Sequence, residues 1–255
     1  MRYISLGSGS KGNATLVEQN GHGILVDCGF SRKMFLSRLE QAGFDVLALR
    51  SVLVTHEHSD HSKGALSLCE TLDIPLWCSH GTAAKMEWLD HPLLRILHND
   101  ELLSIDGLTI CPVTVPHDAR EPLQYVIEGA SSKRLGILSD LGCITPHILS
   151  RYDRCHALQL ESNYDPDMLR DGPYPLTLQR RVGGPHGHLS NQQSAELLRR
   201  LAWSGLNRVS VGHISEKNNN GRLVSQVFSQ VMQCRPEEVE LLEQDSISDW
   251  REVTL

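Results

Sequence analysis

The sequence lacks the cysteine patterns that stabilise small secreted domains or bind structural zinc. Its seven cysteines are an odd number, they are scattered through 255 residues, and no two of them form a CxxC pair. Unpaired cysteines of this kind are typical of reduced thiols in a cytosolic protein. The N-terminal stretch MRYISLGSGSKGN also lacks the apolar core of a signal peptide. We therefore expect a cytoplasmic protein.

An excess of positive charge and a long hydrophobic run are missing as well. Lys and Arg number 24 against 31 Asp and Glu, which gives a net charge of −7 at pH 7. Such a chain has no overall positive field to attract nucleic acid, so a phosphate-bearing substrate needs cations or metal ions placed locally. No apolar run approaches the ~20 residues of a transmembrane helix, and we expect no membrane association. The sequence does not indicate an oligomeric state.

Short apolar runs of β type alternate with helical segments along the chain. In ATLVEQNGHGILVD the linking Asn20 and Gly21 predict a β-hairpin. Helical periodicity is present in residues 31–43, 62–73, 191–205 and 222–233. No linker, low-complexity segment or internal repeat divides the chain, so we expect a single α/β domain over residues 1–255. Residues 165–191 are rich in Pro and Gly, and we expect an ordered loop there.

Residues 51–65, SVLVTHEHSDHSKGA, concentrate ionisable side chains directly after an apolar run. The zinc-protease pattern HExxH fails, because Asp60 stands where the second histidine is required. His56 and His58 are two residues apart and share a face only in an extended segment. Asp60 and His61 follow at a turn, with a helix expected from about Ser62. One segment can thus serve two adjacent metal positions, and ions about 3.5–4 Å apart suit hydrolysis.

Three more residues with metal-binding side chains end apolar runs of β type. These are His117 in TVPHD, Asp140 in GILSDLG and His213 in VSVGHIS. Each alone is more often a hydrogen-bonded polar residue or a helix cap than a ligand. Together with THEHSDH, they predict a metal site in a chain that has thirteen histidines.

Asp27, HEHSDH, His117, Asp140 and His213, in this order, resemble the metal signature of the metallo-β-lactamase superfamily. The resemblance implies an α/β fold, an αββα four-layer sandwich, with two divalent metal ions at one edge. It implies two sets of ligands and a bridging residue: His56, His58 and His117 for the first ion, Asp60, His61 and His213 for the second, and Asp140 between them.

Two further site properties follow from this resemblance. Asp27 would support the histidine loop by hydrogen bonding, although a strand-end aspartate that caps a turn is the alternative. The di-iron flavoproteins of the superfamily carry glutamate at the position of His58, so histidine here favours hydrolysis on zinc or manganese over redox iron. Asp60 is expected to act in catalysis as well as in metal binding.

Three longer stretches resemble the YycJ branch of that superfamily, also called WalJ or VicX. They are LGSGSKGNATLVE, LESNYDPDMLRDGPYPLTLQRRVGGPHGHLSN and GHISEKNNN. This resemblance implies a metal-dependent phosphodiesterase that acts on nucleic acid, a 5′ to 3′ DNA exonuclease in which a hydroxide bridging two metal ions attacks phosphorus. Tyr164 stands where the branch has histidine in the form ESNHD.

The segment GHLSNQQSAELL resembles the histidine loop of tRNA 3′-processing enzymes, which implies that His188 contacts the scissile phosphate and protonates the leaving oxygen. Alternatively, His188 and Ser190 only cap the helix that begins at Asn191. Ser190, Arg181 and Asn219 are further candidates for substrate contacts. Against this, the pair Arg180–Arg181 is typical of a solvated face, and the asparagines after His213 are typical of a turn.

Other interpretations remain open at this point. SGSKGN lacks the spacing of a phosphate-binding P-loop and predicts a turn packed near the site. The alternative functions are an RNA-processing or small cyclic-nucleotide phosphodiesterase, a thioesterase or lactonase of the glyoxalase II type, and a non-catalytic regulatory protein. The GHLSN loop favours phosphate over thioester, and the complete ligand set argues against loss of catalysis.

Overall fold

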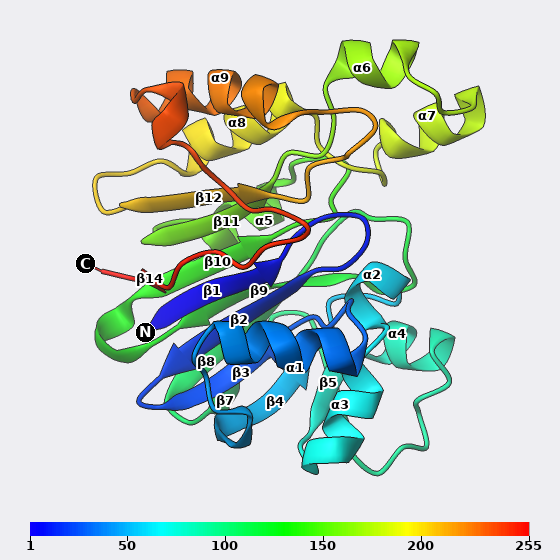
Figure 1. Ribbon diagram of the computed structural model, residues 1–255, viewed down its shortest axis with the longest axis vertical. Helices are drawn as coiled ribbons and strands as arrows, with labels where there is room; N and C mark the ends of the chain where they lie inside the picture. Colours follow the sequence, from blue (N-terminus) through cyan, green and yellow to red (C-terminus); the bar gives the residue numbers. More distant parts are fainter. Residues whose placement is uncertain (255) are drawn as a thin grey trace.

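The computed structural model describes residues 1–254 and contains two seven-stranded β-sheets packed face to face (Figure 1). The first sheet consists of β1 (Arg2–Gly7), β2 (Ala14–Gln19), β3 (His22–Val26), β4 (Leu49–Leu53), β5 (Leu76–Ser79), β6 (Leu94–Leu97) and β14 (Arg251–Glu252). The second consists of β7 (Leu103–Ile105), β8 (Leu108–Thr114), β9 (Leu123–Glu128), β10 (Arg134–Leu138), β11 (Ala157–Glu161), β12 (Arg208–Gly212) and β13 (Glu240–Leu241).

Helices cover the outer faces of both sheets. They are α1 (Arg32–Gln41), α2 (Ser59–Ser62), α3 (Ala65–Leu72), α4 (His80–Lys85), α5 (Pro146–Tyr152), α6 (Pro166–Asp171), α7 (Leu176–Val182), α8 (Asn191–Leu201) and α9 (Gly221–Met232), with short 3₁₀ turns η1 (Val46–Ala48), η2 (Ala130–Ser132) and η3 (Pro236–Glu238). In Figure 1, α1 and α3 lie outside the first sheet, and α8 and α9 lie outside the second. This confirms the expected αββα sandwich.

Each sheet is antiparallel on one side and parallel on the other. The strand orders are β14-β1-β2-β3-β4-β5-β6 and β13-β12-β11-β10-β9-β8-β7. Pairing is parallel from β3 to β6 and from β10 to β13. Because parallel strands run in the same direction, their carboxyl ends lie at the same edge of the sheet. This is the edge at which α/β proteins commonly bind ligands.

Three apolar layers hold the sandwich together. The strand β3 shows how one segment serves two of them: Ile24 and Val26 enter the layer between the sheets, while Leu25 faces the layer under α1 and α3. Alternate residues of a strand point to opposite faces, so a strand covered on both sides is apolar throughout. Fully burying each such side chain contributes roughly 1.5–3 kcal/mol.

The buried tyrosine Tyr125 links the central layer to the site. Its ring is fully buried between the sheets, and its hydroxyl donates a 2.9 Å hydrogen bond to the carbonyl oxygen of Val54. Val54 immediately precedes the histidine-rich loop. The central layer thus fixes the point from which that loop leaves β4.

The structure confirms several sequence-based expectations. The hairpin between β2 and β3 turns at Asn20 and Gly21, which have φ angles of 55° and 82°, as a type I′ turn requires. The helices expected within residues 31–43, 62–73, 191–205 and 222–233 are α1, α3, α8 and α9. None of the helices in residues 1–254 combines the length and the apolarity needed to span a bilayer.

Two sequence-based expectations were wrong. No helix starts at Ser62, because the short helix α2 begins at Ser59 and ends at Ser62, and α3 begins after Gly64. At Gly64 a Cβ atom would lie only 2.1 Å from the Phe30 carbonyl oxygen, so the chain passes too close to Phe30 for a side chain. Residues 165–191 do not form a plain loop, because they contain α6 and α7. The Asp165 side chain caps α6 by accepting hydrogen bonds from Asp167 N and Met168 N.

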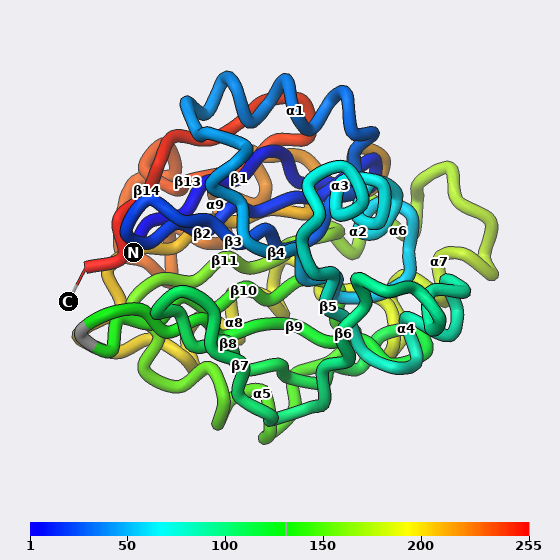
Figure 2. Tube along the Cα trace, turned by 90° about the horizontal axis from the view of Figure 1, so that it is seen from below, coloured from blue at the N-terminus to red at the C-terminus, as the bar shows by residue number. Residues whose placement is uncertain are grey.

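The chain termini lie at the edge opposite α2 and α7 in both views (Figure 2). The edge near α2 is the one that gathers the candidate functional residues.

Candidate metal centre

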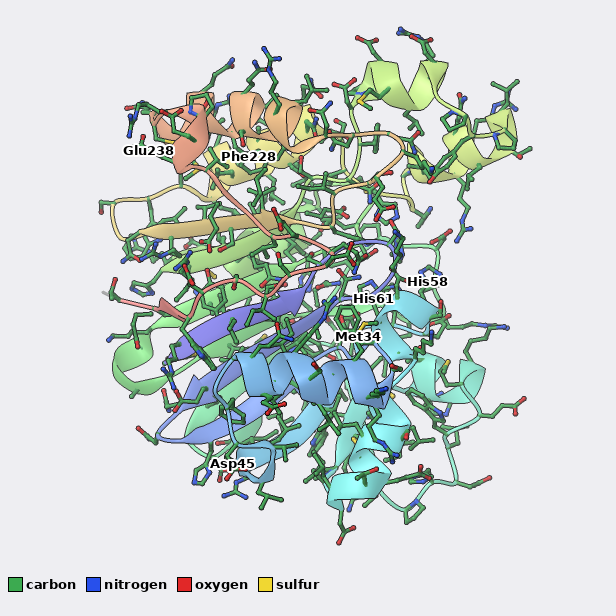
Figure 3. All side chains as sticks on the ribbon, viewed as in Figure 1. Met34, Asp45, His58, His61, Phe228 and Glu238 are labelled. Atoms are coloured by element: carbon green, nitrogen blue, oxygen red, sulfur yellow. The ribbon has the colours of Figure 1, made fainter. Side chains whose placement is uncertain are left out.

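The histidine loop leaves β4 and turns into α2 at the edge between the sheets, where Figure 3 shows His58 and His61 close together. His58 is the N-cap residue of α2 and has extended backbone angles, φ −62° and ψ 143°. It is therefore the last extended residue before the helix. This lets His56 and His58 project together before the chain turns to present Asp60 and His61.

Asp27, which directly follows β3, is linked to this loop by hydrogen bonds. Its Oδ1 accepts a 2.8 Å hydrogen bond from Thr55 N, and its Oδ2 lies 2.7 Å from His61 Nδ1. The Thr55 hydroxyl lies 3.0 Å from both carboxylate oxygens of Asp27 and 3.0 Å from His56 Nδ1. The hydroxyl donates to Asp27 and accepts from His56. These contacts place the ring protons of His56 and His61 on Nδ1 and leave Nε2 of both rings unprotonated.

Three histidine nitrogens converge at the first candidate metal position. His58 Nδ1 lies 2.9 Å from His56 Nε2 and 3.3 Å from His117 Nε2. The other ring nitrogen of His117 donates a 3.0 Å hydrogen bond to the Gly187 carbonyl oxygen. Ligand nitrogens of a tetrahedral zinc ion with bonds of ~2.0–2.1 Å lie roughly 3.3 Å apart. The spacing of this donor set fits a small divalent cation.

A second group lies beside the first. Asp60 Oδ2 is 3.5 Å from His61 Nε2 and 3.6 Å from His213 Nε2. In each of the two groups the potential ligand atoms all lie within 4.8 Å of one another. The two groups draw on the same loop but on different strand ends of the second sheet.

Asp140 lies between the two groups, at the carboxyl end of β10. Its Oδ2 is 3.2 Å from His61 Nε2, and its Oδ1 is 3.9 Å from His117 Nε2. The residue has a φ angle of 53°, a left-handed conformation that aspartate tolerates better than most residues. The seven residues expected as ligands are therefore brought together, and Asp140 faces both groups.

Burial favours the neutral form of two candidate ligands of the first group. It lowers the pKa of His56 well below its ordinary value and also lowers the pKa of His117, because the charged form loses its hydration. Neutral imidazole is the form that binds a metal ion, so these two side chains need not lose a proton first.

In the second group, attraction between opposite charges outweighs burial. Burial alone would raise the pKa of Asp140 and Asp60, but His61 and His213 hold both pKa values below their usual range. Burial would lower the pKa of His61 and His213, but Asp140 raises both. The site thus gathers buried carboxylates that need positive charge close by, which a divalent cation supplies.

The sequence analysis missed Glu161, which ends β11 directly behind the site. Its side chain is fully buried, and its carboxylate accepts hydrogen bonds of 3.0–3.1 Å from the backbone N–H groups of Asp140, Leu141 and Leu189. Burial raises its pKa, but His188 lowers it to about 2. A glutamate that closes the apolar run ALQLE was the available signal, because buried carboxylates are rare without partners.

His188 binds to this glutamate. Its Nδ1 lies 3.0 Å from Glu161 Oε2 and 3.6 Å from Asp140 Oδ1, and within residues 1–254 the polar contacts of the ring run through Nδ1 rather than Nε2. The ring lies 5.3 Å from the His117 ring and 5.2 Å from the His213 ring, centre to centre. His188 therefore stands between a candidate ligand of each group with one ring nitrogen unused.

The turn SGSKGN packs against the site, as the sequence predicts. Asn13 N donates a 2.7 Å hydrogen bond to Asp60 O, and Asn13 Nδ2 lies 3.2 Å from His61 Nε2. Ser8 Oγ accepts a 2.9 Å hydrogen bond from His213 N. The turn therefore links residues of the second group that come from opposite sheets.

Two of the candidate substrate contacts, Ser190 and Asn219, make hydrogen bonds within the protein instead. Ser190 caps α8 in a capping box with Gln193. The Asn219 amide is buried and donates to Ser162 O (2.9 Å) and Asn191 Oδ1 (2.8 Å). Neither residue lines the cavity beside the metal groups. Tyr164 also lies outside it, packed beneath α6 and α7.

A cavity of about 220 Å³ opens beside the two groups. His58, Asp60 and His188 line this cavity. Arg181 also lines it and forms an ion pair with Asp118. Asp118 was also missed from the sequence, and its Oδ1 lies 3.4 Å from His117 Nε2. Arg180 lines a different surface depression on α7, together with Tyr164.

The fold and this His/Asp cluster define a hydrolytic metalloenzyme of the metallo-β-lactamase fold. The profile described as "Beta-lactamase superfamily domain" matches residues 22–214. The chain belongs to this superfamily, and within it to the family of YycJ and WalJ. The resemblance to the metallo-β-lactamase superfamily and the resemblance to its YycJ branch are thus confirmed.

Two curated relatives and one solved structure illustrate the similarity. Exodeoxyribonuclease YycJ of Bacillus anthracis is 29% identical over 237 residues, which cover 91% of this chain and 89% of that protein. Exodeoxyribonuclease WalJ of Streptococcus pneumoniae is 30% identical over 224 residues, which cover 86% and 83%. The metallo-β-lactamase fold protein YhfI of Bacillus subtilis has a TM-score of 0.72 at 11% identity and covers 98% of this chain and 100% of its own.

Proposed function

We propose that the protein is a metal-dependent nuclease that hydrolyses phosphodiester bonds of DNA from the 5′ end. The observation that carries the proposal is His188, which is held by Glu161 beside both candidate metal groups and has a free ring nitrogen at the cavity. The names of the relatives YycJ and WalJ, both called exodeoxyribonucleases, support DNA as the substrate.

We assign two divalent ions, zinc or manganese, to the clustered side chains. The proposed ligands are His56, His58 and His117 for the first ion, Asp60, His61 and His213 for the second, and Asp140 for both. When bound, such ions supply a water nucleophile at neutral pH and neutralise the charge that develops on the phosphoryl oxygens. Imidazole-rich donor sets suit zinc, and carboxylates add affinity for manganese.

The side chains of this chain then orient the reaction. Glu161 fixes the ring of His188 through Nδ1, so that Nε2 can give a proton to the leaving oxygen. Asp60 lines the cavity and can accept a hydrogen bond from the attacking water. Asp27 and Thr55 keep His56 and His61 in the tautomer that leaves Nε2 free for the metal.

Exposed cations that follow cavity residues in the chain can receive the DNA backbone in spite of the net negative charge. Arg120 and Lys217 lie two residues beyond the cavity residues Asp118 and Ser215, are exposed, and form no ion pair within residues 1–254. Lysine and arginine near a site neutralise phosphates without reading sequence. Arg181 is a further candidate phosphate contact, in exchange for its ion pair with Asp118.

The test is a cleavage assay with 5′-labelled and 3′-labelled DNA and RNA, single-stranded and duplex, in zinc or manganese. We expect wild type to shorten DNA from the 5′ end and His61→Ala to leave it intact. Preferential cleavage of RNA or of a cyclic nucleotide would replace DNA as the substrate. If every nucleic acid stays intact while a thioester or lactone is hydrolysed, the nuclease proposal is wrong.

A further inference from the structure

We propose that Tyr174 and Leu178 form the wall that binds the base of the terminal nucleotide, so that the enzyme engages one unpaired end by stacking and without reading base sequence. The inference rests on the proposed nuclease function and specifies how its substrate is held. It concerns the segment that contains α6 and α7, which projects beyond the sheets at the same edge as α2 (Figure 1).

The cavity has an uneven lining that points to such a wall. Its large apolar side chains are Tyr174, Leu178 and Val182, and all three come from this single segment. The remaining lining consists of the metal-group side chains, His188, ion-paired Asp118 and Arg181, small polar residues and a glycine. A substrate with one apolar face and one phosphate face matches this division, and a nucleotide is such a substrate.

The sequence presents these side chains together. Leu178, Arg181 and Val182 are spaced i, i+3, i+4 and therefore share one face of α7. Tyr174 precedes the helix and reaches the same cavity. Leu176, on the same helix, is 68% exposed and does not line the cavity. The inner face of α7 is thus distinguishable from its outer face.

The backbone of Tyr174 is restrained in the absence of a ligand. It lies between Pro173 and Pro175, and the residue before a proline is restricted to extended conformations. Gln179 Nε2 donates a 2.9 Å hydrogen bond to the Tyr174 carbonyl oxygen, which ties the segment back to α7. The residue is half-buried, so part of it remains available to a ligand. A restrained backbone lowers the entropic cost of binding at this position.

The polar part of the lining is suited to backbone contacts. It includes the short polar side chains of Ser10, Asn163 and Ser215, and Arg181, which is ion-paired with Asp118. At about 220 Å³ the cavity is smaller than the 300–1,000 Å³ typical of drug-sized ligands, which limits the enclosed part of a substrate to no more than one nucleotide unit. Stacking on an aromatic ring tolerates every base, because every base has a π-face.

The test combines a variant with a modified substrate. Single-stranded DNA with a 5′-terminal purine is compared with the same strand carrying an abasic terminal residue, for wild type, Tyr174→Ala, Tyr174→Phe and the matched control Leu176→Ala. Base stacking on an aromatic side chain contributes ~1–3 kcal/mol, so we expect KM to rise about 5- to 150-fold for Tyr174→Ala. Tyr174→Phe keeps the ring and should raise KM much less than Tyr174→Ala does, and Leu176→Ala should match wild type.

The decisive readout is non-additivity. Removing the terminal base should raise the KM of wild type by about the same factor and should have little further effect on Tyr174→Ala. Wild type alone, with the two substrates, tests the claim even if Tyr174→Ala does not fold. Equal KM values for the two substrates with wild type, or independent effects of variant and substrate, would overturn the stacking wall.

A binding measurement separates this inference from the proposed function. A strand with a 5′-terminal 2-aminopurine and a phosphorothioate linkage reports stacking through quenched fluorescence without hydrolysis. Cleavage of DNA without base-dependent quenching would contradict base stacking on Tyr174 and leave the nuclease proposal intact. Quenching that needs Tyr174, in an enzyme that cleaves no nucleic acid, would overturn the nuclease proposal alone.

Discussion

His188 Nδ1 lies 3.0 Å from Glu161 Oε2, and this carboxylate is fully buried between three backbone N–H groups. The glutamate is therefore fixed by the sheet edge, and it in turn fixes the imidazole. A ring held by one nitrogen presents the other in a defined direction, which is what proton donation to a leaving group requires.

The first prediction concerns this pair. His188→Ala and Glu161→Gln should each lower kcat on DNA, His188→Ala by ~10²–10⁴-fold, which is the usual contribution of a general acid. Both should lose much less on bis(p-nitrophenyl) phosphate, because its leaving group needs no proton. An equal loss on both substrates, or a loss of bound metal in His188→Ala, would contradict the assigned role.

The second prediction concerns Asp27, which accepts hydrogen bonds from Thr55 N and contacts His61 Nδ1. Asp27→Asn should weaken metal binding ~10–100-fold, because residues that orient metal ligands have effects of this size. Asparagine tolerates the φ angle of 63° at this position, so the backbone should be kept. Metal titration measures the effect, with exposed Asp153→Asn as the control. Equal affinities for the two variants would contradict it.

The third prediction is the metal stoichiometry. Wild type purified with added zinc or manganese should hold about two ions per chain by elemental analysis, and His61→Ala should hold about one, because the first group keeps its three histidines. Well under one ion per chain in wild type would refute the metal assignment.

Metal removal should also lower stability, which is the fourth prediction. A cation that binds only the folded state stabilises it by ~4 kcal/mol at a thousandfold excess over its Kd. Chelation should therefore lower the Tm of wild type, and it should lower the Tm of His56→Ala by less, because that variant keeps only the second set of proposed ligands intact. An unchanged Tm after chelation, with metal loss verified, would show that the cluster does not couple metal binding to folding.

The fifth prediction separates folding from substrate binding at Ser190. Loss of the α8 cap should cost ~0.5–2 kcal/mol of unfolding free energy in Ser190→Ala, measured by urea denaturation. Ser190→Thr, which keeps the hydroxyl, is the matched control. KM for DNA should stay within error of wild type, and a raised KM at full stability would restore Ser190 as a substrate contact.

The sequence contained enough information for the sandwich and for the convergence of the candidate ligands. His56, Asp140 and His213 each follow an apolar strand of the parallel part of a sheet, so the carboxyl ends of these strands lie at one edge. His117 follows β8, which pairs antiparallel with β9 and therefore runs in the same direction as β10. Their role as metal ligands stays a prediction. Glu161 was missed although it also ends a strand, because its partners are backbone N–H groups that no side-chain pattern reveals.

The local errors have physical causes as well. The start of α2 at Ser59 has no side-chain cap, and the helix is instead positioned by tertiary contacts such as the 2.8 Å hydrogen bond from Cys28 N to His61 O. In residues 165–191 the Pro and Gly content concealed two short helices. Asp165 before Pro166 is a helix start signal that outweighs composition at that point.

The two candidate metal groups draw from both sheets. His56, His58, Asp60 and His61 follow a strand of the first sheet, while His117, Asp140 and His213 follow strands of the second. Neither sheet supplies a complete set, so an ion bound here would cross-link the two sheets. A metal-binding signal during refolding would then report the docking of the two sheets, and fragments divided between β6 and β7 should each fail to bind metal while their reassembled complex succeeds.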